Sequence, residues 1–460
     1  MSDYESFLAS KAVRAPMRGL TEAPVVASHL FPFQKACVWF LLRVGSGGLF
    51  LDTGMGKTAV ELEWCRHASD ETGKPALILT PLAVARQIER EGKRWGYDCS
   101  VIRDQSEAGP GINICNYDRL DKLDPDAFGA VALDEASILK SFTGKTTRAL
   151  IRAFAGHRFR LVATATPAPN DHMELGQYGE FCGIMPSNEM LMRWFIADQT
   201  EMGRYRLKGH AVTDFWDWMA SWCRMAEKPA DLGDISVNFD LPPLETVRHR
   251  AAASKIKGLE GGLFQAFEMS ATKLHDVKRQ TAQARAAALA EIVRREPTEP
   301  WLIWVDTDYE ADAVMAALPE AVETRGSHSV DLKESRILDF VEGRARVLIG
   351  KPGMLGFGMN FQHCARMAFV GRSYSYETWY QAVRRCWRFG QTRPVTVHLI
   401  VAEGEAEIGR VIERKADDHA SMKAAMRAAM GRATGNKSAL RVAYAAKHRA
   451  ALPSWIREAS

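Results

Sequence analysis

The 460-residue sequence predicts an α/β fold with two doubly wound parallel sheets, a helical insertion between them and a helical C-terminal tail. Two observations carry this prediction: short apolar runs alternate with helical stretches in two separate regions, and a glycine-rich loop joins a strand to a helix in the first region. The length suits two to three domains of roughly 150 residues each. Hydrophobic residues make up 47% and charged residues 25%, which is typical of globular proteins and excludes a disordered or fibrous chain.

Residues 1–178 form the first predicted lobe. Five short runs in this region are apolar on both faces, as parallel strands covered by helices must be. These runs are Leu49–Leu51, Ala76–Thr80, Ile112–Asn116, Ala130–Leu133 and Leu161–Thr164. Longer helical stretches lie between several of them, which predicts a doubly wound parallel sheet.

Residues 179–239 have a different texture and are predicted to be a helical insertion. Large apolar side chains recur there at near-helical spacing: Met190, Trp194, Phe195, Trp216, Met219 and Trp222. Tryptophans of this segment can stack on single-stranded bases, but an aromatic stripe at helical spacing more often packs in a core. Asp240–Pro243 breaks the pattern and predicts a linker.

Residues 240–415 form the second predicted lobe, and residues 416–460 a basic helical tail. Strand patterns return at Trp301–Val305, Arg346–Ile349, Met367–Val370 and Val395–Val401. The tail is rich in cations: Lys423, Arg427, Arg432, Lys437, Arg441, Lys447, Arg449 and Arg457. Because the net charge of the whole chain is only +4, this local excess fits either a polyanionic partner or a solvated helix face.

Several classes of protein are excluded by the sequence. No apolar run approaches the roughly 20 residues that span a bilayer, so no membrane partner is expected. The first ten residues carry Asp3 and Glu5 and have no apolar core, unlike a signal peptide. The eight cysteines are scattered without metal-ligand spacing, which argues against a zinc site and favours a reducing compartment. We therefore expect a cytoplasmic protein.

A phosphate-binding loop follows the first apolar strand. Leu49–Leu51 runs into Asp52-Thr-Gly-Met-Gly-Lys-Thr58, and a helical stretch comes next. The strict pattern has glycine at position 51, where this chain has leucine. Gly54 and Gly56 would turn backbone N–H groups toward phosphate oxygens, and the helix N-terminus adds partial positive charge. In this loop Lys57 would reach the outer phosphates of a nucleotide, and Thr58 would ligate Mg²⁺.

An acidic pair ends the strand at Ala130–Leu133. Asp134 and Glu135 would stand at the carboxyl edge of the sheet, where open α/β sheets bind ligands. In that place Asp134 would hold Mg²⁺, and Glu135 would activate the attacking water. The same pair alone would be read as two surface acids, but beside a phosphate loop in one sheet it predicts a nucleotide site.

Taken together, these residues resemble the motor core of superfamily two helicases, and its Swi/Snf-like branch in particular. In the first lobe the resemblance rests on Phe31–Gln34 (Gln motif), Asp52–Thr58 (motif I), Thr80–Leu82 (motif Ia), Asn116–Tyr117 (motif Ib), Asp134–Ser137 with Lys140 (motif II, DEAD/DEAH-like) and Thr164–Asn170 (motif III). In the second lobe it rests on Leu302–Trp304 (motif IV), Gly326–His328, Gly353–Asn360 (motif V) and Gln381–Gln391 (motif VI).

The resemblance implies two RecA-like lobes, ATP and Mg²⁺ as cofactors, and a role for each matching residue. Lys57, Asp134, Glu135, Arg385 and Arg388 would be catalytic, with the two arginines as fingers reaching from the second lobe. Because Arg385 and Arg388 are three apart, they would share one face of a helix. The nucleotide would be bound by Gln34, Gly54, Met55, Gly56, Lys57, Thr58 and Gly358, with Gln34 reading adenine.

Nucleic acid is the partner that the resemblance implies, with DNA favoured over RNA. The contacts would be made by Thr80, Asn116, Tyr117, Lys140, Gly326, Ser327 and Lys351. Most of them would meet phosphates, so binding would depend little on sequence and would weaken with salt. Opening and closing of the lobes would move two grips relative to each other. The compact chain is similar to bacterial and phage versions of this motor.

Three functions stay open at this point. The first is a DNA-stimulated ATPase that translocates on duplex DNA, as the Swi/Snf-like branch tends to do. The second is a strand-separating DNA or RNA helicase on the same engine. The third is a non-catalytic scaffold that binds nucleic acid, against which the presence of Lys57, Asp134, Glu135 and both arginines argues.

Overall fold

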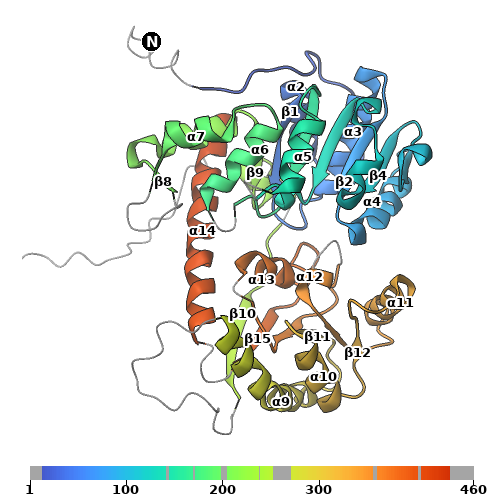
Figure 1. The fold of residues 1–460 in the computed structure, drawn as a ribbon, viewed down its shortest axis with the longest axis vertical. Coiled ribbons are helices and arrows are strands. Elements are labelled where there is room, and N and C mark those ends of the chain that lie inside the picture. The colour runs from blue at the N-terminus through green and yellow to red at the C-terminus, as the bar shows by residue number, and fades with distance from the viewer. Residues whose placement is uncertain are drawn as a thin grey trace, which may run out of the picture.

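The computed structural model of the chain describes residues 13–140, 144–168, 171–197, 205–237, 239–251, 271–355, 360–373, 375–401 and 406–435. Each half of the chain builds one parallel sheet with helices around it, and a long C-terminal helix stands beside both halves (Figure 1). The predicted fold class of two α/β lobes is confirmed by these two sheets.

The first sheet has the strand order β3-β4-β2-β5-β6-β1-β9, and all of its neighbouring strands are parallel. Its strands are β1 (Ser46–Leu51), β2 (Ala76–Thr80), β3 (Cys99–Val101), β4 (Ile112–Asn116), β5 (Ala130–Asp134), β6 (Phe159–Ala163) and β9 (Cys223–Ala226). The five predicted strands form its centre, and every residue of β1, β2, β5 and β6 is buried. The carboxyl ends of β1 and β5 therefore bring the phosphate loop and the acidic pair to one edge.

Helices cover both faces of this sheet. They are α2 (Pro32–Val44), α3 (Lys57–Thr72), α4 (Leu82–Arg94), α5 (Lys145–Ala153), α6 (Leu175–Phe181), α7 (Ser187–Trp194) and α8 (Val212–Ala220). Short 3₁₀ helices are η1 (Gln105–Glu107), η2 (Tyr117–Lys122), η3 (Pro125–Ala127), η4 (Ala136–Lys140), η5 (His172–Glu174), η6 (Gly209–Ala211) and η7 (Pro229–Leu232).

The segment 179–239 is not a separate helical insertion, as the sequence pattern suggested. Its strand β9 pairs in parallel with β1 at the edge of the first sheet, and a small antiparallel pair joins β7 (Phe195–Ala197) to β8 (Tyr205–Leu207). The tryptophans of the segment belong to the core of the first lobe, since Trp194, Trp216, Trp218 and Trp222 are at most 4% exposed. Their burial confirms the core interpretation and removes them from contact with bases.

The second sheet has the order β10-β15-β14-β11-β13-β12 and is parallel throughout. Its strands are β10 (Leu244–Arg250), β11 (Trp301–Trp304), β12 (Val322–Glu323), β13 (Val347–Gly350), β14 (Arg366–Phe369) and β15 (Val395–Val401). Its helices are α9 (Ala271–Arg295), α10 (Asp308–Ala317), α11 (Val330–Val341), α12 (Pro352–Leu355) and α13 (Tyr376–Val383). The four predicted strands are present, and β10 and β12 add the two edges.

The C-terminal helix α14 (Ala406–Thr434) runs from the second lobe back to the first (Figure 1). Met422, Met426, Ala429 and Met430 of α14 are buried within the core cluster of the first lobe. The predicted tail boundary at residue 416 falls inside this helix, and residues 436–460 lie outside the described residues. None of the helices in the described ranges combines the length and the apolar character that a membrane crossing requires.

Candidate active site

The phosphate loop joins β1 to α3 through a tight turn that needs glycine. Gly54 and Gly56 have φ angles of +92° and +74°, a region that side chains disfavour. A Cβ atom on Gly56 would also lie 2.3 Å from Nε2 of Gln34. The Lys57 ammonium donates to the carbonyl oxygen of Leu51 at 3.1 Å, so it lies across the loop. Lys57 and Thr58 begin α3, which aims the helix N-terminus into the loop.

Gln34 packs directly against this loop. Its Nε2 donates to the carbonyl of Met55 at 3.0 Å, and its Oε1 accepts from the backbone N–H of Phe31 at 2.9 Å. The side chain is buried at 5% exposure. Gln34 therefore ties the start of α2 to the loop, next to the position where the sequence analysis expects a nucleotide.

Asp134 is buried at the end of β5, where Thr80 at the end of β2 and Tyr117 directly after β4 fix it. The Thr80 hydroxyl donates to its carboxylate at 2.8 Å, and the Tyr117 hydroxyl donates to its backbone carbonyl at 2.7 Å. Burial and the nearby charge of Glu135 raise the pKa of Asp134 to about 6, although the Thr80 hydrogen bond and Lys57 act against this shift. Two crowded carboxylates of this kind are a donor set suited to a divalent cation.

Thr80 and Tyr117 were predicted to contact nucleic acid, and their placement corrects that prediction. Thr80 is fully buried and Tyr117 is 5% exposed. Both hydroxyls face Asp134 instead of the surface, because β2 pairs with β5 and β4 follows on the other side of β2. Their role in this structure is to hold the acidic residue.

Glu135 has a strained backbone. Its φ of +49° is the only positive value among the described residues other than glycine. Such a conformation costs about 1–3 kcal/mol and concentrates at functional sites. The Thr164 hydroxyl lies 3.4 Å from a Glu135 carboxylate oxygen. Glu135 thus leaves the strand directly after β5 ends at Asp134, and its charge acts on Arg385 of the second lobe.

The second lobe brings its arginines to this edge, but on a turn rather than on a helix. Helix α13 ends at Val383, so the predicted shared helix face of Arg385 and Arg388 is wrong. Arg385 is buried at 5% exposure. Burial lowers its pKa to about 10, and the opposing charges of Glu135 and Asp134 favour its charged form. Arg385 therefore lies within electrostatic reach of both acidic residues of the first lobe.

Arg388 lies against the phosphate loop itself. A Cβ atom on Gly54 would be 3.2 Å from the backbone nitrogen of Phe389 and 3.8 Å from Cβ of Arg388. The chain after α13 thus packs so closely on the loop that a Cβ atom at position 54 would press against the backbone of Phe389. The structure therefore places Arg385 and Arg388 of the second lobe at the edge of the first lobe that holds Lys57, Asp134 and Glu135.

Asp52 is a functional candidate that the sequence analysis did not single out. This first residue of the loop is buried, and its carboxylate accepts a hydrogen bond from the Tyr380 hydroxyl at 2.6 Å. The same carboxylate pairs with Arg384 at 2.8 Å and with Lys423 at 3.1 Å. Burial would raise the pKa of Asp52, but Arg384, Lys423 and the Tyr380 hydrogen bond hold it well below its usual range. The partners are more than 300 positions away, so no local pattern reveals them.

A second contact between the lobes involves Glu377 of α13. Its carboxylate accepts the Thr166 hydroxyl at 3.0 Å and pairs with the Lys140 ammonium. Lys140 was predicted to contact nucleic acid, and here its charge faces the second lobe with its side chain 14% exposed. Thr166 belongs to the segment identified with motif III, so this segment touches the second lobe directly.

The other predicted nucleic-acid contacts lie nearer the surface. Asn116 is half-buried and caps η2 by accepting from the backbone of Asp118. Gly326 and Ser327 are exposed in the turn after β12. Lys351 follows β13 and pairs with Asp308 at 2.8 Å. Gly358, predicted to bind the nucleotide, lies outside the described residues.

Glu61 is a buried carboxyl group one turn beyond Lys57 on α3. It is fully buried, and within the described part of the chain neither carboxyl oxygen has a hydrogen-bond partner. Burial and the charges of Asp134 and Glu135 raise its pKa well above the ordinary value, with Lys57 opposing them. Glu63 on the same helix is the opposite case. Hydrogen bonds from His67, Arg66 and Tyr97 outweigh burial and hold its pKa well below the usual range.

We expect Glu61→Gln to stabilise the protein more as pH rises. A carboxyl group whose folded-state pKa is raised loses its stabilising contribution as pH climbs from the unfolded pKa toward the folded one. The gain in Tm should therefore be larger at pH 8 than at pH 5, about 2 °C or more at the higher pH. Thermal melts in EDTA without nucleotide measure it.

Glu63→Gln is the matched control for this melt series. Its folded-state pKa is lowered, so its contribution is present above the unfolded pKa, and the substitution should destabilise at both pH values. An equal Tm change for Glu61→Gln at pH 5 and pH 8 would contradict the ionisation argument.

Comparison with known proteins agrees with the motif series. The chain is 22% identical over 449 residues to the Bos taurus SWI/SNF-related matrix-associated actin-dependent regulator of chromatin subfamily A-like protein 1, covering 86% of this chain and 45% of that protein. It is 22% identical over 477 residues to a Bacillus subtilis (strain 168) protein named as an ATP-dependent helicase/translocase, YwqA, covering 88% of this chain and 51% of that protein. The chain thus spans about half the length of these relatives.

A third relative, the DNA repair and recombination protein RAD54B of Gallus gallus, is 27% identical over 197 residues, which are 36% of this chain and 21% of that protein. No protein-family model matches the chain. Among solved structures, the Sulfolobus solfataricus SWI2/SNF2 ATPase core in complex with dsDNA aligns with 91% of this chain and 97% of that chain, at 18% identity and a TM-score of 0.42.

Proposed function

We propose that this chain, a relative of the Swi/Snf-like motors of superfamily two, hydrolyses ATP to move along DNA. The observation that carries the proposal is that the second lobe contacts the first at the edge of the sheet that holds the phosphate loop. The first lobe supplies Lys57, Asp134 and Glu135, and the second supplies Arg385 within reach of both acids. Hydrolysis of a nucleotide held there would require both lobes together, which couples chemistry to lobe movement.

The residues of the first lobe fit ATP and Mg²⁺. Gly54, Met55 and Gly56 form the turn that would receive the phosphates, and Lys57 would bind their outer oxygens. Thr58 and Asp134 would hold the metal, which would neutralise charge on the phosphates. The raised pKa of Asp134 reflects burial and crowding by Glu135, and a divalent cation would relieve this crowding.

Glu135 and the arginines would perform the remaining chemistry. Glu135 would orient the attacking water, for which its strained turn places the carboxylate outside the strand. Arg385 would stabilise the charge that develops on the transferred phosphoryl group. Arg388, packed on Gly54, would approach the phosphates from the loop side.

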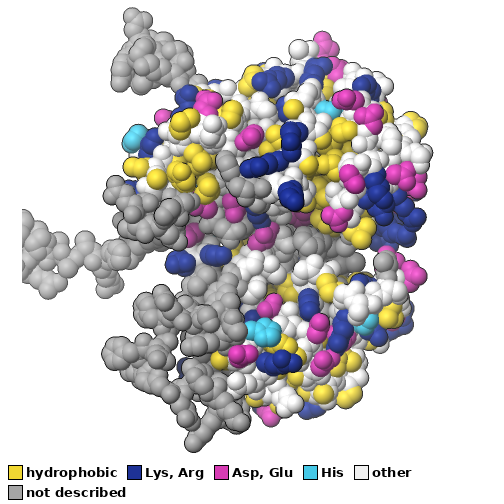
Figure 2. Space-filling model, viewed as in Figure 1, with side chains coloured by type: hydrophobic (Ala, Val, Ile, Leu, Met, Phe, Trp, Pro, Cys, Tyr) yellow, Lys and Arg dark blue, Asp and Glu magenta, His cyan; other side chains and the backbone are white. Residues whose placement is uncertain are grey.

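DNA would bind across both lobes, chiefly through phosphate contacts. Five of the predicted nucleic-acid contacts are kept in this proposal: Asn116, Lys140, Gly326, Ser327 and Lys351. Exposed cations on α4 and α5 join them: Arg86, Arg90, Lys93, Arg94, Lys145, Arg148 and Arg152. Figure 2 shows Lys and Arg side chains on the surface of the first lobe. Because these contacts are to the backbone, little sequence preference is expected.

The test is ATP turnover with single- and double-stranded DNA and RNA of equal length. We expect duplex DNA to stimulate phosphate release most strongly. The DNA concentration for half-maximal stimulation should rise at least tenfold between about 50 and 200 mM salt, because cations released from DNA oppose binding. Stimulation by RNA alone would favour a strand-separating RNA helicase instead. Nucleic-acid binding without any turnover would favour a scaffold, and both results would overturn the proposal.

A further inference from the structure

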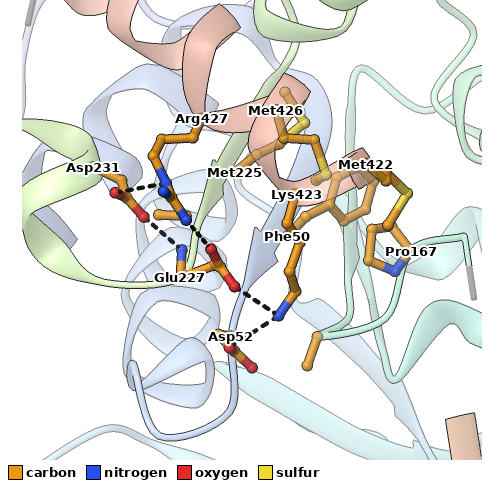
Figure 3. Close-up of a pocket in the computed structure, with 12 residues that line it drawn as sticks. Phe50, Asp52, Pro167, Met225, Glu227, Asp231, Met422, Lys423, Met426 and Arg427 are labelled. Carbon is orange, nitrogen blue, oxygen red and sulfur yellow. Dashed lines mark hydrogen bonds and ion pairs between the residues drawn. The ribbon is translucent and has the colours of Figure 1, made fainter. Parts of the chain in front are cut away.

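A series of alternating charges, half-buried at one end and buried at the other, runs from the first lobe through α14 to the segment of the second lobe that carries Arg384 and Arg385, here called the arginine segment. Figure 3 shows most of it, with Lys423 and Arg427 of α14 pointing toward carboxylates of the first lobe. In order, the series is Asp231, Arg427, Glu227, Lys423, Asp52 and Arg384. The members come from η7, the end of β9, α14, the phosphate loop and the turn after α13.

Lys423 occupies the centre of this series. Its ammonium lies 3.2 Å from Glu227 and 3.1 Å from Asp52, and it donates to the Tyr380 hydroxyl at 2.8 Å. Tyr380 in turn donates to Asp52 at 2.6 Å. The Lys423 side chain is 13% exposed and that of Asp52 is 6% exposed, so water screens these contacts little.

Stability alone does not explain such an arrangement. Burying several charges costs desolvation energy, and apolar side chains of similar size often give equal or greater stability. The charges instead fix relative positions, because each hydrogen-bonded ion pair holds one group in a defined place relative to the next. Met422 and Met426 on the apolar side of α14 already attach the helix to the first lobe. The ion pairs are therefore not needed to hold α14, and we infer that they fix the position of the phosphate loop.

The series ends beside the arginine finger. Arg384 pairs with Asp52 at 2.8 Å and donates to the carbonyl of Thr53 at 3.3 Å, so it is fixed to the first two residues of the loop. Arg385 is the next residue, and its position depends on the same turn. Any loosening of Asp52 therefore moves the finger as well as the loop.

We propose that Lys423 is a positioning residue of the ATP site, which docks the arginine segment of the second lobe on the phosphate loop through Asp52 and Tyr380. This inference rests on the proposed ATPase function. It makes α14 part of the catalytic arrangement, although α14 supplies no group that touches the nucleotide.

Lys423→Met should lower kcat for ATP by roughly 10- to 100-fold, the scale of a small misplacement of a reacting group. KM for ATP should change less than about threefold, because the proposed nucleotide contacts of the first lobe do not include Lys423. Tyr380→Phe keeps the buried ring and removes only the hydroxyl, so it should shift kcat in the same direction with less risk to folding.

Arg432→Met is the matched control. Arg432 lies on the same helix and pairs with Asp217, but this pair is exposed and is not a member of the charge series that reaches Asp52. Wild-type kcat and KM are expected for it. The double variant Asp52→Asn/Lys423→Met removes one charge of each sign, so its kcat should exceed the value that independent effects of the two single changes predict.

Hydrogen exchange gives a readout that does not depend on turnover. In Lys423→Met, the amides of residues 52–58 and 384–391 should exchange faster than in Arg432→Met. Equal exchange and equal kcat in these two variants would overturn the positioning role, and so would a change confined to KM. A wild-type protein without ATPase activity would refute the proposed function instead, and the exchange comparison would still decide whether Lys423 holds the two segments.

Discussion

Arg385→Ala should lower kcat for ATP hydrolysis by about 10³-fold or more, with KM for ATP changed only a few fold. Hydrolysis spreads negative charge over the transferred phosphoryl group, and an arginine delivered to that charge accounts for about 10³–10⁵ in rate where it has been studied. Arg385 is buried, and the charges of Glu135 and Asp134 act on it. Its charge would act mainly in the transition state, which is why kcat should fall and affinity should not.

Two further variants make this measurement specific. Arg388→Ala should also lower kcat more than affinity. Its effect should be the smaller of the two, because the acid that acts on its charge is Glu91, whereas Glu135 and Asp134 act on Arg385. Arg344→Ala removes an exposed arginine that pairs only with Asp339 and Glu342 among its described contacts, and should leave turnover unchanged. Steady-state phosphate release over a range of ATP concentrations gives both constants. A rise in KM at constant kcat would make Arg385 a binding residue.

Lys57→Ala should abolish measurable ATP turnover, a loss of at least about 10²-fold, while the protein stays folded. Removal of one preorganised charged donor from an enclosed site typically costs 10²–10³-fold in rate. Lys57 is half-buried at the start of α3, and its ammonium makes one hydrogen bond, to the Leu51 carbonyl, among the described contacts. Loss of this bond costs little stability, since the Leu51 carbonyl lies at the end of a strand whose backbone is already paired.

Folding and function are separated by pairing the assay with thermal melts and circular dichroism. Lys74→Ala is a suitable control, since Lys74 lies beyond the other end of α3 and donates to the Asp126 carbonyl at the surface. Its turnover should match that of the wild type. Turnover near the wild-type rate in Lys57→Ala, with nucleic acid present, would remove the phosphate loop from the mechanism.

The sequence predicted the parts of the site that depend on local chain geometry. A strand followed by Gly54, Gly56 and Lys57 has one common solution, and the structure has that turn. Asp134 and Glu135 follow a strand of the same sheet, so parallel pairing alone brings them to the same edge. Order along the chain was enough for these residues.

Contacts between distant segments could not be read in the same way. Asp52 looked like an ordinary loop residue because its partners Tyr380, Arg384 and Lys423 lie in another lobe and in α14. The tail cations Lys423, Arg427 and Arg432 were open to a polyanion or to solvent, and the structure pairs them with carboxylates of the first lobe. Ion pairs between residues so far apart in the chain produce no periodic pattern in the sequence.

The sequence also failed to predict two edge strands and the direction of two side chains. The strands β9 and β10 escaped notice because neither is a continuous apolar run: β9 contains Arg224 and β10 is mostly exposed. Thr80 and Tyr117 were assigned to the surface because their motifs were matched by order alone, while their hydroxyls point inward at Asp134. A motif match locates a residue in the chain but not the face on which its side chain lies.

The path of α14 restricts how the protein can be divided for study. A fragment that stops where the second sheet ends would lack Met422, Met426 and Met430, and would leave the tryptophan-rich face around α8 open to water. Such surfaces promote aggregation. The first lobe cannot be excised cleanly either, since its apolar interior is completed by residues about two hundred positions downstream of β9. Protein prepared for crystallisation or single-molecule work should keep both lobes and α14 in one polypeptide.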